Sequence, residues 1–207
     1  MERIKGKRET VYFSSMGRDN VSETIKIVKE RCKTGDIKKV LIFAATKESV
    51  INLANVLKDS DCKVCAVTFP YEYSFFIRKE DEEHPEEVIP ETSQDGIREA
   101  FAEVGVELIQ GVMPFEEIVL PGVSELKIQV LIRTLELISR GLPLCVQAAV
   151  MACDSGCVKL GEKIIVMTAD TAVVMTATQK RWIFHPKKGI DIHEILCKPY
   201  NSRIGNT

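Results

Sequence analysis

The chain has 207 residues, of which 28 are Lys or Arg and 30 are Asp or Glu, so its formal net charge is −2. A composition that is 45% apolar and 28% charged is typical of a globular protein and excludes a disordered chain. The near-zero charge argues against nucleic acid as a partner, because a nucleic-acid-binding surface normally appears as a clustered basic excess. At this length we expect a single domain over residues 1–207.

No segment of the sequence predicts a membrane partner. The longest uninterrupted apolar run is Val40–Ala45, far shorter than the roughly 20 residues that a membrane-spanning helix needs. The first nine residues are mostly charged and lack the apolar stretch of a secretory signal. We therefore expect a cytoplasmic protein.

The seven cysteines are expected to be reduced and mostly buried thiols. Cys62 and Cys65 fall on a predicted strand, where positions three apart point to opposite faces and cannot chelate one metal ion. Cys153 and Cys157 could share a helical face, but Gly156 lies between them, where we expect the helix to end. The sequence therefore predicts no metal site and no redox pair from these local spacings.

Strands and helices are predicted to alternate from the start of the chain. A short strand at Thr10–Phe13 precedes a helix capped by Asn20 or Ser22, whose apolar residues recur at spacings of four, three and four. Gly35 ends that helix. The continuous apolar run of Lys39–Ala45 is too short for a buried helix and predicts a buried strand.

A second helix begins at Thr46 and is followed by a strand at Val64–Thr68. From Phe69 to Thr92 no periodicity is visible, and the stretch contains an acidic run between Glu80 and Glu87. A connection of that length in a compact domain is usually a functional loop, a lid or a disordered segment. The acidic run itself is typical of a solvated surface.

The middle of the chain predicts two more helices and a strand. A helix opens at Ser93, a strand follows at Val106–Gln110, and a loop lies between Pro114 and Pro121. Ser124 begins a longer amphipathic helix. Its apolar stripe consists of Ile128, Leu131, Ile132, Leu135 and Ile138.

The last third begins with Leu142–Asp154, a segment that is apolar almost all round and rich in small residues, as in a helix buried within a fold. Two strands follow at Lys163–Thr168 and Thr171–Met175, and a short helix is predicted near Asp191–Leu196. Strands that alternate with helices predict an α/β sandwich around a mostly parallel sheet.

A ligand site in such a sheet lies at the carboxyl ends of the strands. After the strongest strand, the hydroxyls of Thr46 and Ser49, the ammonium of Lys47 and the free N–H groups of a helix start could hold a phosphate. Glu48 opposes this interpretation, because a carboxylate in the first turn repels an anion. The alternative is that Thr46 only caps the helix and Glu48 complements its dipole. No Walker or G-x-G-x-x-G sequence is present.

Two further polar loops follow predicted strands. One is Thr168–Thr171, with Asp170 and Thr171 as candidate ligand contacts, and the other is the loop from Ser14 to Asn20. Purely local Asx and Thr turns produce the same pattern, so each loop also has a structural interpretation. Three polar loops at strand ends are consistent with one shared cleft.

Catalytic chemistry has little support in the sequence, and we assign no catalytic residue. No nucleophile elbow or zinc-protease motif is present, and the three histidines, His84, His185 and His193, are expected at the surface or at caps. Trp182, the only tryptophan, is expected to pack or to form a homo-oligomer contact rather than to stack on a ligand.

Several segments share their order with a known family whose pattern is similar to M-A-A-D-A-G, then a strand, then G-A-D-T-A-V-V. The chain resembles stand-alone proteins built like the C-terminal domain of pyruvate kinase, a largely uncharacterised archaeal and bacterial group. The matching segments are Tyr12–Phe13 with Gly17 and Asn20, Val40–Ser49, Met151–Gly156, Lys163–Val166, Ala169–Val174 and Glu194–Pro199. The resemblance spans most of the chain.

The resemblance implies a three-layer α/β/α sandwich that binds a phosphorylated ligand, with flavin mononucleotide (FMN) as the associated cofactor and sugar phosphates as the other candidates. By position, the phosphate would be held by Thr46, Lys47 and Ser49, and the cleft would be lined by Asn20, Thr68, Asp170 and Thr171. Pyruvate kinase activity is not expected, because the catalytic barrel of that enzyme has no counterpart in this chain.

The leading hypothesis is therefore a small-molecule-binding protein for a phosphorylated ligand. An FMN-dependent enzyme is the first alternative. The second is a degenerate family member that acts as an oligomeric interaction module, which is favoured by Glu48 and Met167 at positions where the family has glycine-containing turns.

Overall fold

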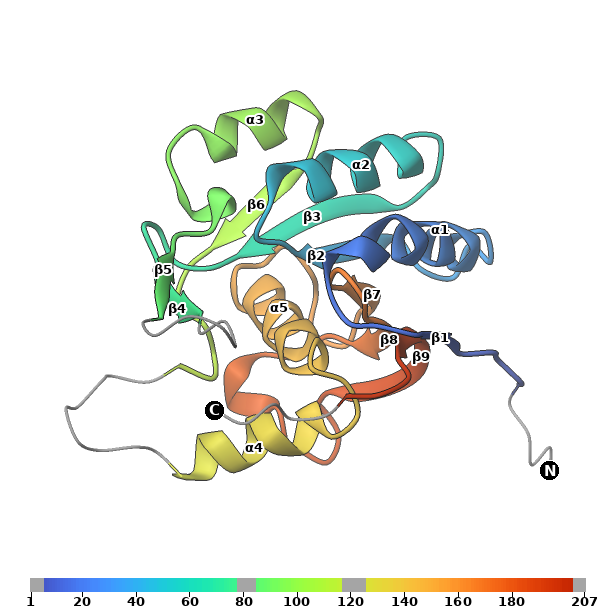
Figure 1. Ribbon diagram of the computed structural model, residues 1–207. Coiled ribbons are helices and arrows are strands. Elements are labelled where there is room, and N and C mark those ends of the chain that lie inside the picture. Colours follow the sequence, from blue (N-terminus) through green and yellow to red (C-terminus); the bar gives the residue numbers. More distant parts are fainter. Residues whose placement is uncertain (1–5, 78–84, 117–125, 203–207) are drawn as a thin grey trace.

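Figure 1 shows a computed structural model of the chain, which describes residues 6–77, 85–116 and 126–202. A mixed, mostly parallel sheet of seven strands forms its centre. Six of the strands run in one direction and only β8 is antiparallel to its neighbours. Their spatial order is β1 (Val11–Phe13), β9 (Asp191–Pro199), β8 (Ala172–Thr176), β7 (Lys163–Met167), β2 (Lys39–Phe43), β3 (Lys63–Thr68) and β6 (Glu107–Gln110).

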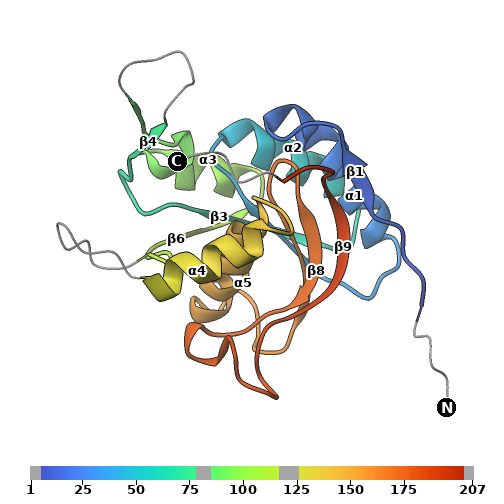
Figure 2. The ribbon, with the colours of Figure 1, turned by 60° about the horizontal axis from the view of Figure 1, so that its bottom comes forward.

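Helices cover both faces of this sheet, so the described part of the chain has three layers (Figures 1 and 2). One face packs against α1 (Val21–Cys32), α2 (Lys47–Leu57) and α3 (Ile97–Glu103), and the other packs against α5 (Leu142–Asp154), which is covered in turn by α4 (Leu126–Glu136). The alternation of side chains along β2 produces this arrangement, since Val40 and Ile42 contact the first layer and Leu41 and Phe43 the second. The predicted α/β class with a mostly parallel sheet is confirmed.

The two most apolar segments occupy the centre of the fold, as their sequences predict. Val40 to Phe43 in β2 are buried on both faces of the sheet. Every residue of α5 from Cys145 to Cys153 is buried, because this helix lies between the sheet and α4. The predicted bounds of α5 are confirmed, and Asn20 and Thr46 are the N-cap residues of α1 and α2.

The helix predicted near Asp191–Leu196 is wrong: these residues belong to β9. The apolar positions Ile192, Ile195 and Leu196 have helical spacing, but they all face packed side chains on a strand because bulges in the β8–β9 ladder break its regular alternation. Pairing with β8 on one side and β1 on the other outweighs the local helical pattern.

The stretch from Phe69 to Thr92 contains more structure than the absence of periodicity predicts. Two short strands, β4 (Phe75–Ile77) and β5 (Glu86–Val88), form a separate antiparallel pair. Residues 78–84, which include most of the acidic run, lie outside the described residues. Ser93 ends a 3-10 turn, and α3 begins only at Ile97. The predicted start of α4 at Ser124 also lies outside the described residues.

Among the described residues, no helix combines the length and the apolar character that crossing a membrane requires.

One buried ion-pair network joins α1 to the sheet. The guanidinium of Arg31, only 7% exposed, donates two hydrogen bonds of 2.8 Å to the carboxylate of Glu194 on β9. It also donates to Asp36, whose second partner is the ammonium of Lys163 on β7. The hydrogen bonds from Arg31 hold the pKa values of Asp36 and Glu194 below their usual range.

We predict that Arg31→Met lowers the free energy of unfolding by about 3 kcal/mol at neutral pH, because it leaves the Glu194 carboxylate largely buried without its partner. Urea unfolding monitored by circular dichroism measures this change. Lys26→Met is the matched control, since Lys26 forms an exposed ion pair with Glu23 on the same helix. Equal losses in the two variants would contradict a stabilising role for the network.

The same network predicts a dependence of stability on acid pH. Because both carboxyl pKa values are lower in the folded than in the unfolded chain, their contribution to stability is complete above about pH 5 and is lost as the pH falls below about 4. In Arg31→Met this acid-side loss should be smaller. Urea titrations at several acid pH values compare the two slopes, and identical slopes would contradict the assignment.

Candidate functional site

A cavity of about 490 Å³ lies at the carboxyl edge of the sheet. It is bounded by the ends of β2 and β7 and by the residues at the starts of α1, α2 and α5. Parallel strand order produces part of this arrangement, because β1 and β2 run toward this edge and are followed by α1 and α2, which start there. The lining residues that the argument uses are Arg18, Phe43, Thr46, Glu48, Ser49, Phe69, Arg140, Gly141, Leu144 and Asp170.

Three of the predicted binding residues line this cavity: Thr46, Ser49 and Asp170. The hydroxyl oxygens of Thr46 and Ser49 lie 3.1 Å apart, and Ser49 donates to the Thr46 carbonyl. The Thr46 side chain makes no capping hydrogen bond to α2. The two hydroxyls therefore form a local pair at the helix start, in reach of a bound molecule.

Asp170 is held in place from two sides. Its carboxylate accepts a hydrogen bond of 2.8 Å from the backbone N–H of Gly17 and one of 3.1 Å from the Thr171 hydroxyl. These bonds tie the β7–β8 turn to the loop that follows β1. The two polar loops predicted to share a cleft are thus in contact at its rim.

The other four predicted residues do not line the cavity. Asn20 donates to the Ser15 carbonyl and orders the β1–α1 loop. Thr68 is buried and donates to the Ala44 carbonyl. Thr171 is buried, and its hydroxyl forms a hydrogen bond with the hydroxyl of Ser139. The fourth residue, Lys47, does not line the cavity.

The backbone N–H of Lys47 has a partner within the protein. It donates a hydrogen bond of 2.8 Å to the carboxylate of Glu91, which follows β5. Glu91 therefore neutralises part of the positive end of the α2 dipole. In the alternative interpretation Thr46 caps this helix, but its side chain makes no capping hydrogen bond, and Glu91 bonds to the helix start instead.

The sequence prediction missed the two cations of the cavity, Arg18 and Arg140. Arg18 lies in the polar loop after β1, where only Asn20 was selected. Arg140 directly precedes the N-cap of α5 and was not among the predicted site residues. No local signal in the sequence identifies either arginine, because the direction in which its side chain points is decided by packing in the folded chain.

Apolar side chains form the rest of the cavity. Phe69 and Leu144 line it together with Phe43 at the end of β2. The Phe69 ring packs edge-on against Phe43 with 5.0 Å between centroids and stacks on Tyr73 at 5.1 Å. A cavity with an apolar wall, two arginines and two hydroxyls fits a ligand with a flat ring and an anionic group.

The histidines and the tryptophan lie away from this cavity. The Nδ1 atom of His185 accepts hydrogen bonds from the backbone N–H groups of Lys187 and Lys188 and so orders the turn that follows it. His193 is paired with the Thr176 hydroxyl on β8. Trp182 packs edge-on against His185 with Arg181 over its ring. His84 lies outside the described residues.

No model of a known protein family matches the chain.

The start of α5 fits the cavity rim only because residue 141 is glycine. A Cβ atom at Gly141 would lie 2.5 Å from the Thr168 hydroxyl and 2.7 Å from the Thr171 hydroxyl, closer than van der Waals contact allows. Thr171 is fixed by its bond to Ser139, so it has little room to move. The close approach sets the position of Arg140 and the helix start next to the turn that carries Asp170.

We predict that Gly141→Ala lowers the free energy of unfolding by about 1–3 kcal/mol through overpacking at this contact. Thermal and urea unfolding measure the change. Gly111→Ala is the matched control, because a Cβ atom there meets nothing within 4 Å. A loss at Gly111 as large as that at Gly141 would show that the close approach is not responsible.

Proposed function

We propose that the protein binds a phosphorylated small molecule in this cavity, with FMN as the leading candidate and sugar phosphates as the other. The observation that carries the proposal is that Arg18, just before α1, and Arg140, just before α5, both line a cavity whose wall is largely apolar. Arginine forms paired hydrogen bonds with phosphate oxygens, and the dipole of a helix N-terminus adds to the attraction. The resemblance to stand-alone pyruvate kinase C-terminal-domain-like proteins supports the same ligand class.

The electrostatic attraction must be local, because the chain as a whole is slightly acidic. Two arginines share the cavity with the carboxylates of Glu48 and Asp170. Since Asp170 is already bonded to Gly17 and Thr171, its charge is partly compensated. We infer that the phosphate lies closer to the arginines than to Glu48, whereas the resemblance assigned it to Thr46, Lys47 and Ser49.

The apolar wall gives a reason to prefer FMN over a sugar phosphate. Phe43, Phe69 and Leu144 offer surface that a flavin ring can cover and that the hydroxyls of a sugar cannot. A cavity of about 490 Å³ is also within the range of small-molecule sites. This open cavity argues against the alternative of an oligomeric interaction module, because a degenerate protein of that kind was expected to have a filled cleft.

Binding of FMN is tested by titration calorimetry and by quenching of flavin fluorescence, with riboflavin and a sugar phosphate as comparison ligands. We predict that FMN binds more tightly than riboflavin, because only FMN carries the phosphate, and that Arg140→Ala weakens FMN binding about 10- to 100-fold. Riboflavin binding should change little in that variant.

The matched control for Arg140→Ala is Arg181→Ala, which removes an arginine that stacks on Trp182 outside the cavity. FMN affinity should be unchanged in it. Absence of binding to FMN and to sugar phosphates would refute the proposed ligand class. Equal affinity for FMN and riboflavin would refute the role of the arginines as a phosphate site.

We also predict that Glu48→Gln strengthens FMN binding about fivefold, because removing a carboxylate from the cavity lessens repulsion of the phosphate by roughly 1 kcal/mol. The same titration measures the gain. Glu23→Gln changes a first-turn carboxylate of α1 outside the cavity and serves as the control. A weaker complex in Glu48→Gln would mean that the carboxylate itself contacts the ligand.

A further inference from the structure

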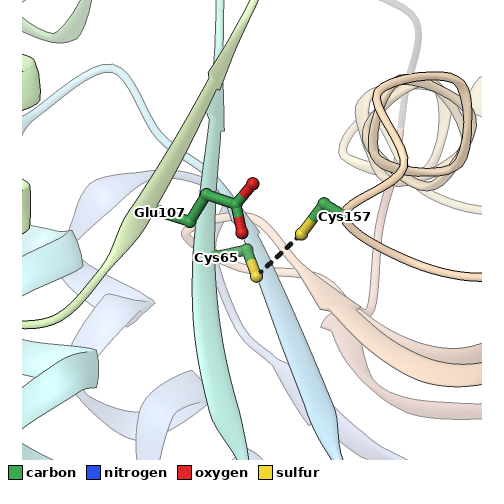
Figure 3. Close-up of side chains that lie close together, drawn as sticks. All are labelled: Cys65, Glu107 and Cys157. Atoms are coloured by element: carbon green, nitrogen blue, oxygen red, sulfur yellow. Dashed lines mark hydrogen bonds between the residues drawn. The ribbon is translucent and has the colours of Figure 1, made fainter.

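Two cysteines from distant parts of the chain meet at the opposite edge of the sheet (Figure 3). The thiol of Cys157, in the loop after α5, donates a hydrogen bond to the sulfur of Cys65 on β3, with 3.0 Å between the sulfur atoms. A carboxylate oxygen of Glu107 on β6 completes the group, in which all three donor atoms lie within 4.8 Å of one another. This group is referred to below as the thiol–carboxylate cluster.

The parallel register of the sheet brings the three side chains together. Cys65 is paired with Glu107 across β3 and β6, so both side chains point to the face covered by α5. α5 runs from the cavity to the opposite edge, and its chain turns at Gly156, which has a positive φ of 82°. Cys157 is the next residue, and its thiol reaches Cys65 from the α5 side of the sheet.

Sequence spacing cannot reveal this pair. Cys62 lies in the core cluster on the other face of the sheet from Cys65, as the strand alternation predicted. Cys153 is separated from Cys157 by the end of α5. Neither Cys65 nor Cys157 can therefore pair with the cysteine nearest to it in sequence. The two are 92 residues apart and meet only in the folded chain.

We propose that Cys65, Cys157 and Glu107 bind a divalent cation of the zinc type, with a water molecule as fourth ligand. Two thiolates and a carboxylate match the preference of Zn²⁺ for sulfur donors and tetrahedral coordination. Zn–S bonds of about 2.3 Å in a tetrahedral site place two sulfur atoms roughly 3.8 Å apart. The two sulfur atoms, which are 3.0 Å apart, would therefore move apart by less than about 1 Å when the ion binds.

The charges around the cluster support a cation. Within the described part of the chain, the carboxylate of Glu107 has no hydrogen bond or ion pair. Lys39 is the nearby positive group, and its ammonium contacts the Cys157 carbonyl and the Glu162 carboxylate, at 3.7 Å from the latter. Two thiolates, Glu107 and Glu162 carry four negative charges, and Lys39 balances one of them, so a bound divalent ion lowers the remaining negative charge of the group.

Access and enclosure also suit a metal. Cys65 is 3% and Cys157 8% exposed, whereas Glu107 is exposed on the edge strand β6. A cation therefore reaches the cluster through the Glu107 side and is then enclosed by the sulfur atoms.

The test uses protein stripped with a chelator and kept reduced, then titrated with Zn²⁺ against a chromophoric competitor. We expect one ion per chain and a rise in the melting temperature. Replacement by Co²⁺ should give thiolate-to-cobalt charge-transfer absorption and the strong visible bands of tetrahedral coordination. This spectrum reports sulfur ligation directly and does not depend on the ligand of the cavity.

Cys65→Ser and Cys157→Ser should each weaken Zn²⁺ binding more than about 100-fold, exceeding the loss typical of an outer-shell partner. Glu107→Gln, which alters an exposed side chain and leaves folding intact, should weaken it at least about 10-fold. Cys62→Ser is the matched control, because its buried thiol bonds to the Ile37 carbonyl in the other core cluster. Its Zn²⁺ affinity should equal that of the wild type.

The proposal is overturned if the reduced protein binds no Zn²⁺, or if Glu107→Gln and wild type bind it equally. Equal weakening of Zn²⁺ binding by Cys62→Ser would show that the ion binds at a thiol outside the thiol–carboxylate cluster, which would also overturn the proposal. A peptide mass map that shows Cys65 and Cys157 joined by a disulfide in protein purified under reducing conditions would also refute a metal site.

Discussion

Parallel pairing of β2 with β3 and β7 is the constraint on which the rest of the structure depends. It joins residues 40–42 to residues 165–167, more than a hundred positions apart. Because the strands run the same way, every helix that follows one must cross back, so helix starts meet at one edge and helix ends at the other. The cavity and the thiol–carboxylate cluster are the two consequences, and α5 connects them.

The two edges differ in the charge that they offer. At the carboxyl edge, Arg18 and Arg140 lie beside helix starts, and the carboxylates of Asp170 and Glu91 are bonded to backbone N–H groups. At the opposite edge, Glu107 and two thiols gather beside Lys39. An almost neutral chain thus gathers arginines at one edge of the sheet and acidic groups with thiols at the other, which its net charge does not indicate.

Sequence reasoning succeeded where a segment is decided by its own pattern. β2 and α5 are apolar enough to be buried wherever they pack, and Asn20 and Thr46 occupy predicted N-cap positions, although neither side chain makes a capping hydrogen bond. Sequence reasoning failed at β9, because its apolar residues have the spacing of a helix. Bulges in the pairing with β8 allow these side chains to pack into the core from a strand. For the cavity it identified Thr46, Ser49 and Asp170, which follow strands, but missed Arg18 and Arg140, since nothing local shows which way an arginine points.

The sequence by itself determined the α/β class, the buried strand and helix at the centre, and the polar strand-end loops that border the cavity. Tertiary structure decided which polar groups remain available there: the N–H of Lys47 is occupied by Glu91, and Thr68 and Thr171 are buried in internal bonds. It also decided that Cys65 meets Cys157. The physical reason is that periodicity acts within a few residues, whereas hydrogen-bond partners and ligand sets form between segments that only the packed sheet brings together.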